Sequence, residues 1–159
     1  MLNLKLYNIS RGGLLAFDLD IFGKVSLVLG DSATGKTYLT DALVSIINQQ
    51  GIWEYKCIDT SRRGAEIEVY AAATLTDLRY YMTEKEGALI VVDEDLADLA
   101  RTTNIKYEDS NNYFLIFDRD DIIRYNKDTA SLYTLNKVYT DKRYIVTLKP
   151  LNQHIKIGG

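Results

Sequence analysis

The sequence predicts an α/β domain of three layers with a mostly parallel central sheet. Two continuous apolar runs, residues 88–92 and 113–117, are typical of strands that are buried on both faces of a parallel sheet. A third apolar run, residues 24–29, precedes a segment with helical periodicity. Because strands that alternate with helices are joined by right-handed crossovers, we expect parallel pairing between them.

The composition is that of one folded domain. The chain has 159 residues, of which 47% are apolar, and no repeat or shift in composition divides it. We therefore treat residues 1–159 as a single domain. It consists of an N-terminal β-hairpin (1–22), a nucleotide-binding core (23–135) and a C-terminal strand and tail (136–159).

Charge and cysteine content narrow the function classes. The net charge is −3 without a long block of one sign, so nucleic-acid binding is not indicated. Cys57 is the only cysteine, which excludes an intrachain disulfide and favours a reducing, cytoplasmic location. The first residues alternate and show no signal-peptide pattern, and no apolar run approaches the length of a membrane span.

The first half of the chain begins with the predicted hairpin. Residues 2–9 and 14–21 alternate between apolar and polar side chains and are separated by a glycine-containing turn. After the strand at 24–29, the helix carries one apolar face and ends near Gly51. Residues 52–58 are predicted to form the next strand. The apolar face of the helix that follows the strand at 24–29 consists of Leu39, Ala42, Leu43, Ile46 and Ile47.

The second half continues the alternation. Residues 67–73 fit either a short strand or a connection. Thr74 or Thr76 can N-cap a helix that runs to about Glu84. A shorter helix follows the strand at 88–92, over about 96–101, and then a polar loop. Two more strands are expected after the run at 113–117, over residues 131–135 and 143–148, with a turn between them.

Residues 30–37 match the phosphate-binding motif G-x-x-x-x-G-K-[ST], or Walker A. Its glycines allow backbone N–H groups to approach a phosphate, and the following helix start adds partial positive charge. Lys36 can reach the β- and γ-phosphates, and the Thr37 hydroxyl can ligate Mg²⁺. The predicted phosphate-binding residues are Gly30, Asp31, Ser32, Ala33, Thr34, Gly35, Lys36, Thr37 and Tyr38.

A second acidic motif follows the apolar run at 88–92. An apolar strand that ends in Asp-Glu is the Walker B pattern, which predicts that Asp93 holds Mg²⁺ and that Glu94 orients or deprotonates an attacking water. Asp95 is expected to N-cap the next helix. The carboxyl ends of parallel strands meet at one edge, so we expect residues 30–37, Asp93 and Asp118 to lie on the same edge of the sheet.

Together these motifs resemble those of the P-loop NTPases, over roughly residues 25–135. The resemblance is to the branch with a glutamate beside the Walker B aspartate, which includes AAA+, RecA-like and ABC-type ATPases. It implies a three-layer fold with strand order 5-1-4-3-2, in which strand 113–117 lies between the two Walker strands. It also implies a γ-phosphate sensor after that strand. Asp118 occupies this position, where the pattern prefers Asn, Thr, Ser or His, and Arg119 is the alternative.

The chain departs from the two best-known groups of that branch. It has no Leu-Ser-Gly-Gly-Gln signature, as ABC ATPases have, and no C-terminal helical lid, as AAA+ modules have. Residues 114–119 and 131–135 are similar to segments of short, stand-alone P-loop proteins of Firmicutes and their mobile elements. That resemblance implies nucleotide binding without a defined biological role.

The sequence therefore leaves three functions open. The first is slow Mg-dependent ATP hydrolysis, completed by an arginine from a second copy or a protein partner. The second is a nucleotide-dependent binding module, and the third is a small-molecule kinase. Catalysis in the first would depend on Glu94 and Lys36, with ATP and Mg²⁺ as cofactors. The candidate arginines are Arg62, Arg63, Arg101 and Arg124.

Overall fold

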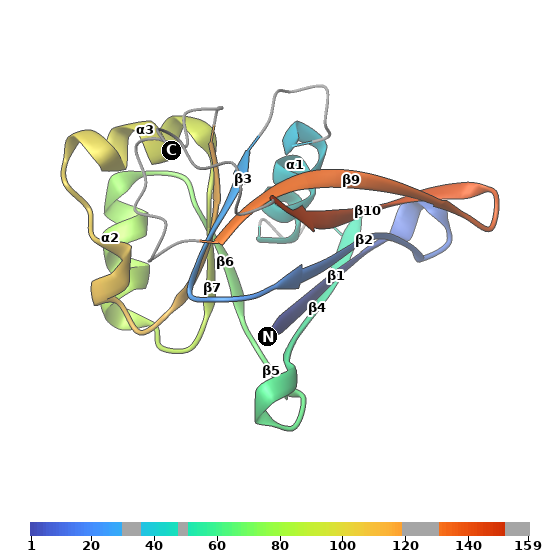
Figure 1. Ribbon diagram of the computed structural model, residues 1–159, viewed down its shortest axis with the longest axis horizontal. Coiled ribbons are helices and arrows are strands. Elements are labelled where there is room, and N and C mark those ends of the chain that lie inside the picture. The colour runs from blue at the N-terminus through green and yellow to red at the C-terminus, as the bar shows by residue number, and fades with distance from the viewer. Residues whose placement is uncertain (30–35, 48–50, 119–130, 152–159) are drawn as a thin grey trace.

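A single curled sheet dominates the computed structural model, which describes residues 1–29, 36–47, 51–118 and 131–151 (Figure 1). The side chains of Lys36, Thr37, Thr40, Ile46 and Ile47 are not described. The predicted fold class, a mostly parallel three-layer P-loop NTPase fold, is wrong. The structure is mostly β, and its ten-stranded sheet mixes parallel with antiparallel pairs and curls into a half-barrel.

The strands follow the order β5-β4-β1-β2-β10-β9-β3-β8-β7-β6 across the sheet. Strands from the beginning and the end of the chain therefore lie next to each other in its middle. Their bounds are β1 (Leu2–Asn8), β2 (Leu14–Ile21), β3 (Val25–Leu29), β4 (Trp53–Asp59), β5 (Ala65–Glu66), β6 (Val69–Ala72), β7 (Leu89–Val92), β8 (Tyr113–Phe117), β9 (Ser131–Thr140) and β10 (Arg143–Pro150).

One half of the sheet is parallel. The strands β9, β3, β8, β7 and β6 pair in this order, each parallel to its neighbour. The helices α2 (Leu75–Glu84) and α3 (Glu94–Thr102) cover one face of it, where Leu78 and Leu96 pack against Ile90 and Phe114. Within this half, strand β8 lies between β3 and β7, as the resemblance implied for the strand at 113–117.

The other half of the sheet is largely antiparallel. Strand β1 pairs antiparallel with both β2 and β4, and β9 pairs antiparallel with β10. The two hairpins join through a short parallel contact, in which Val146 and Thr147 of β10 lie beside Phe17 and Asp18 of β2. This contact makes one continuous sheet out of two halves with different strand directions.

Helix α1 (Lys36–Ile47) packs on the concave face of the curled sheet. Its buried side chains Leu39, Ala42 and Leu43 share one hydrophobic core with Leu4 of β1 and Leu115 of β8. The helix contacts β4 near one end of the strand order and β6 at the other end. The sheet must curl for both to reach the same helix.

The wrong fold class has a physical origin in residues 52–58. These residues do form a strand, β4, but it pairs antiparallel with β1 and does not enter the parallel half. Its side chains alternate in exposure, as expected for a strand with one solvated face. Residues 67–73, which the sequence left ambiguous, supply the edge strand β6 of the parallel half instead.

Several local predictions are confirmed. The hairpin at 2–21 forms, helix α1 follows the phosphate-binding motif, and Thr74 N-caps α2. Asp77 completes a capping box with Thr74, since each side chain accepts a hydrogen bond from the other's backbone N–H. Strands β9 and β10 are longer than predicted, because their pairing continues to the turn at Asp141 and Lys142.

We expect Leu43→Ala to destabilise the protein by about 2–5 kcal/mol, because it removes a buried side chain from the core beneath α1. The matched control is Val44→Ala on the exposed face of the same helix, which should change stability by less than about 0.5 kcal/mol. Urea unfolding followed by circular dichroism measures both. Equal stabilities of the two variants would show that α1 does not anchor the sheet.

Candidate functional site

The predicted site residues follow three neighbouring parallel strands. Strand β3 ends at Leu29, β8 ends just before Asp118, and β7 ends just before Asp93. In the pairing register Val28 lies beside Phe117, and Val92 lies beside Ile116. The three strand ends therefore meet at one edge of the sheet, where α3 also lies (Figure 1). This edge is called the carboxyl edge below.

The phosphate-binding segment connects β3 to α1 at this edge. Residues 30–35 lie outside the described residues, as do Arg119 and Arg124. Lys36 and Thr37 are the first two residues of α1, which places their backbone at the start of the helix. The segment thus has a strand before it and a helix after it, as the motif requires.

Tyr38 belongs to an aromatic cluster beside the start of α1. Its ring lies 5.3 Å from the ring of Phe17 and 5.5 Å from that of Trp53, measured between centroids. Phe17 is buried, whereas 48% of Tyr38 is exposed. The cluster anchors the first turn of α1 to β2 and β4, and one side of the Tyr38 side chain stays accessible to solvent.

Asp93 performs a structural task at the carboxyl edge. Its Oδ1 accepts a hydrogen bond of 2.9 Å from the backbone N–H of Leu96, so Asp93 is the N-cap of α3. The prediction that Asp95 caps this helix is therefore wrong. Asp95 and Glu94 lie in the first helical turn, where negative charge favours the helix dipole. Among the described residues, no group of three or more His, Cys, Asp or Glu side chains is arranged to hold a metal.

Asp118 is buried and forms an ion pair within the chain. Its side chain is only 2% exposed, and its Oδ2 lies 2.6 Å from Nη1 of Arg101. Its backbone N–H donates a 2.9 Å hydrogen bond to the carbonyl of Val28, which ties it to the end of β3. The sequence-predicted sensor thus lies directly beside the strand that leads into residues 30–35.

Arg101 joins Asp118 to helix α3. It lies in the last turn of α3 and also bonds Asp98 of the same helix. Sequence reasoning considered Arg101 only as an arginine for another subunit and missed this pair. The available signal was weak, because an arginine near a helix C-terminus is common for reasons of the helix dipole alone. Nearby, burial raises the pKa of Tyr107 to about 12, with Asp118 adding to the rise and Arg101 opposing it.

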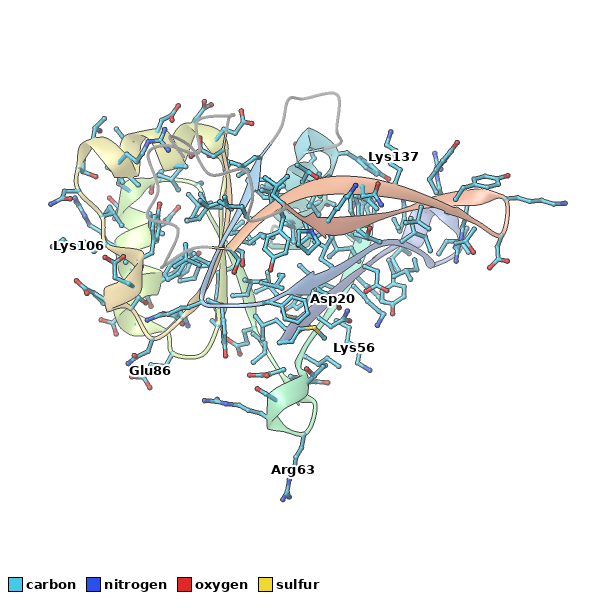
Figure 2. The ribbon with its side chains drawn as sticks, viewed as in Figure 1. Asp20, Lys56, Arg63, Glu86, Lys106 and Lys137 are labelled. Atoms are coloured by element: carbon cyan, nitrogen blue, oxygen red, sulfur yellow. The ribbon has the colours of Figure 1, made fainter. Side chains whose placement is uncertain are left out.

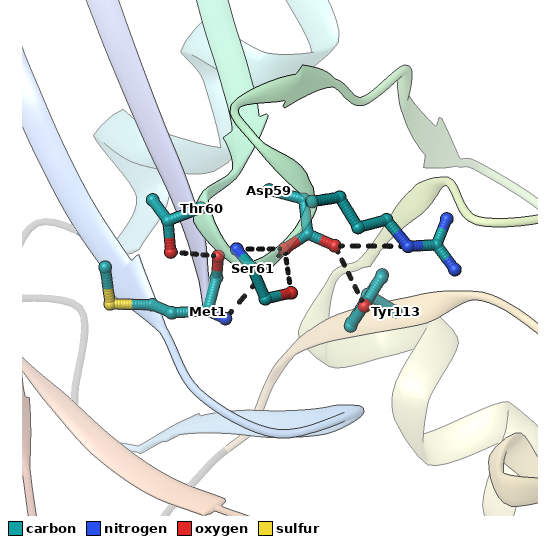
Figure 3. A network of polar contacts seen from close by, with 6 residues as sticks. Met1, Asp59, Thr60, Ser61 and Tyr113 are labelled. Carbon is teal, nitrogen blue, oxygen red and sulfur yellow. Dashed lines mark hydrogen bonds and ion pairs between the residues drawn. The ribbon is translucent and has the colours of Figure 1, made fainter.

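A different polar network lies at the opposite edge of the sheet (Figure 3). Asp59, which is 1% exposed, accepts hydrogen bonds from the backbone N–H and the hydroxyl of Ser61, at 3.0 and 2.6 Å. Its other oxygen lies 3.4 Å from the Tyr113 hydroxyl, and the amino group of Met1 lies 4.0 Å away. The Ser61 hydroxyl holds the pKa of the Asp59 carboxyl below its usual value, against the opposing effect of burial.

A depression of about 610 Å³ lies beside this network, at the amino ends of the parallel strands. Its lining includes Lys24, Arg62, Gly87 and Tyr113. Glu86 and Arg63 also lie on this side of the molecule, away from α3 (Figure 2). The depression is therefore separate from the predicted phosphate site. Because Arg62 lines the depression, it lies far from the carboxyl edge of its own chain.

Cys57 has no catalytic character. Burial, reinforced by the charge of Asp59, raises the pKa of its thiol to about 12, so the thiol stays protonated at neutral pH. Its side chain belongs to the core between β1 and α1. Cys57 is therefore a core residue.

Comparisons with known proteins add no family assignment. No protein-family model matches the chain, and no curated protein is significantly similar to it. None of the helices in the described ranges combines the length and the apolar character that crossing a membrane would demand.

We expect Arg101→Gln to cost about 3–5 kcal/mol of stability, because it removes a cationic partner from the buried Asp118. The double variant Arg101→Met with Asp118→Leu should lose much less, since no buried charge remains. Asp98→Asn is the control, because Asp98 is 44% exposed and its ion pair is screened by water. Chemical unfolding measures all three, and a double variant that loses as much stability as Arg101→Gln would contradict the coupling.

Asp59→Asn should cost about 1–3 kcal/mol at pH 7, since the charged carboxylate accepts its hydrogen bonds in a buried position. The folded-state pKa of Asp59 lies below its unfolded value of about 3.9, so this stabilisation is complete above that value. The difference from the wild type should shrink as the pH falls below about 4. Asp141→Asn in an exposed turn is the control, and a difference independent of pH would argue against an ionised Asp59.

Proposed function

We propose that this chain binds Mg–ATP at the carboxyl edge, where β3, β8 and β7 end, and hydrolyses it slowly. The observation that carries this proposal is that residues 30–37 begin directly after β3 and include the first two residues of α1. This is the strand–loop–helix context in which the motif G-x-x-x-x-G-K-[ST] binds phosphates. The proposal depends on this local arrangement and not on a fold family.

The polar residues of the same edge support the proposal. Asp118 follows β8, the neighbour of β3 in the sheet, and Asp93 follows β7, the next strand beyond β8, so both lie at the edge where α1 begins. Asp93 uses one carboxylate oxygen for the helix cap, and Mg²⁺ would bind through the other, directly or through water. Ligands of parallel sheets bind at this end of the strands.

In the proposed reaction, Lys36 contacts the β- and γ-phosphates and Thr37 ligates Mg²⁺ together with Asp93. Glu94 orients a water molecule that attacks the γ-phosphorus, the bond to the bridging oxygen breaks, and ADP and phosphate leave. Asp118, held by Arg101, is less suited to contact the γ-phosphate than a neutral sensor, because two negative groups would meet. Arg119 then remains as the alternative sensor.

Self-association, or a protein partner, is the second part of the proposal. An additional arginine would stabilise the charge that develops on the transferred phosphoryl group. Arg101 is engaged by Asp118 and Asp98, and Arg62 lies at the opposite edge of its own chain, so neither serves the same chain's site. A cytoplasmic location is also proposed, on the ground that the sole cysteine forms no disulfide.

Binding is tested by thermal unfolding with and without Mg–ATP. Ligand at about 100 times Kd should stabilise the protein by roughly 2.7 kcal/mol, which raises Tm by roughly 5–11 °C for a chain of this length. Lys36→Ala should abolish the shift, whereas Lys56→Ala on the exposed face of β4 should keep it. If no Mg–nucleotide raises the Tm, the proposal is wrong.

Hydrolysis is tested separately by phosphate release. Glu94→Gln should retain the thermal shift and lose turnover, while Glu84→Gln on the exposed surface of α2 should release phosphate like the wild type. Binding without Glu94-dependent release would identify a nucleotide-dependent binding module. ATP consumption that rises with an added hydroxyl acceptor would identify a kinase instead.

A further inference from the structure

The distal halves of β9 and β10 form a two-stranded arm that extends away from the body, here called the β9–β10 arm (residues 136–145; Figure 1). Val138, Tyr139 and Tyr144 are 42%, 62% and 63% exposed. The rings of Tyr139 and Tyr144 pack together with centroids 5.1 Å apart, on the face that carries the buried Leu135 and Val146 nearer the body. The arm thus continues the apolar face of the core into solvent.

One backbone edge of the arm has no strand beside it. Strand β3 pairs with β9 only from Ser131 to Thr134, and no other described strand pairs with β9 on that side. On the other side, β10 pairs with β2 of the same chain at Val146 and Thr147, at the base of the arm. An unpaired strand edge presents a row of N–H and C=O groups that can pair with another strand.

From this edge and its side-chain order we propose that two copies of this chain associate through β9, edge to edge and antiparallel, around a two-fold axis at Val138. This pairing would join the two sheets into a continuous one. The β9 edge would be the contact surface for the self-association in the proposed function. This pairing does not depend on nucleotide binding. The partner is a second copy because the segment around Val138 is complementary to itself.

The complementarity is visible residue by residue. In an antiparallel pair centred on Val138, Lys137 lies opposite Tyr139 of the second copy, and Asn136 lies opposite Thr140. Each ammonium group can then lie against a tyrosine ring, which is a favourable cation–π contact, and no like charges face each other. Lys137 extends from β9 at the surface of the arm (Figure 2). A single lysine on an edge strand usually opposes pairing, but here its opposite neighbour is aromatic.

An arginine in the arm supports the same register. Arg143 has two covered nitrogens, Nε and Nη1, that find no hydrogen-bond acceptor within the described part of the chain. It lies opposite Thr140 on the arm, and Thr140 would face Asn136 of the second copy. Arg143 and that Asn136 would then be two strands apart, about 10 Å, a span that the two side chains cover together.

The interface is small, which sets the affinity. A stable dimer buries about 800 Å² on each copy. The paired segment is about five residues, or roughly 16 Å, long, and it buries less than that area. We therefore expect a dimer with a Kd in the micromolar range, so sedimentation velocity must cover about 5–500 µM chain.

Cysteine crosslinking without nucleotide tests the axis directly. Val138→Cys would place two thiols next to each other across the two-fold axis, and the native Cys57 is buried and does not compete. Copper–phenanthroline oxidation should give a disulfide-linked dimer on a non-reducing gel. The control is Glu84→Cys, an exposed site on α2, which should crosslink at only the slow collisional rate. Equal rates for both variants would overturn the proposal.

Two substitutions of opposite charge at Tyr139 test the register of the proposed pairing. In the Val138→Cys background, Tyr139→Glu and Tyr139→Lys both remove the ring and introduce charges of opposite sign. The glutamate would face Lys137 of the second copy and the lysine would repel it, so the glutamate variant should crosslink about tenfold faster at low salt. The difference should fall in 0.5 M salt. Equal rates for two variants that unfold like the wild type would exclude this register.

Because no nucleotide is present, failure of the crosslinking test leaves the Mg–ATP thermal shift as an independent result. A wild type that stays monomeric at 500 µM would also overturn the proposal. Concentration-dependent dimerisation that Tyr139→Lys abolishes would support it.

Discussion

The burial of one apolar face of α1 in the concave side of the sheet is the constraint on which this structure depends. Leu39, Ala42 and Leu43 are nearly inaccessible to solvent and share a core with strands from both halves of the sheet. One helix can contact both β4 and β6 only if the sheet curls. The same helix begins at Lys36, so the packing that shapes the sheet also fixes where the phosphate-binding segment must end.

Helix α3 connects two of the acidic residues at the carboxyl edge. Asp93 holds its first turn by capping Leu96, and Asp118 holds its last turn through Arg101. The two carboxylates that follow β7 and β8 are therefore connected by one rigid element. A ligand that binds the Asp93 carboxylate would affect the N-cap of α3. A ligand that binds the Asp118 carboxylate would compete with the guanidinium of Arg101. The electrostatics of the edge and the stability of α3 are thus coupled.

The two edges of the parallel half have opposite roles. The carboxyl edge carries the starts of α1 and α3 and the acidic side chains of Asp93 and Asp118. The opposite edge is organised by Asp59, whose hydrogen bonds link the end of β4 to its following turn and to β8. The long hairpin of β9 and β10 extends from the body (Figure 1), and its exposed tyrosines and unpaired strand edge are the features on which the proposed dimer depends.

The sequence by itself determined the local elements and the order of residues at the site. Helical periodicity after Thr37, the capping threonine before α2 and the apolar runs at β7 and β8 are properties of neighbouring residues, so they could be predicted. The fold class could not, because strand direction depends on contacts between residues far apart. Val146 of β10 pairs with Phe17 of β2, and β4 pairs with β1. The pair between Arg101 and Asp118 is decided in the same way, since only the packing of α3 beside β8 brings the two side chains together.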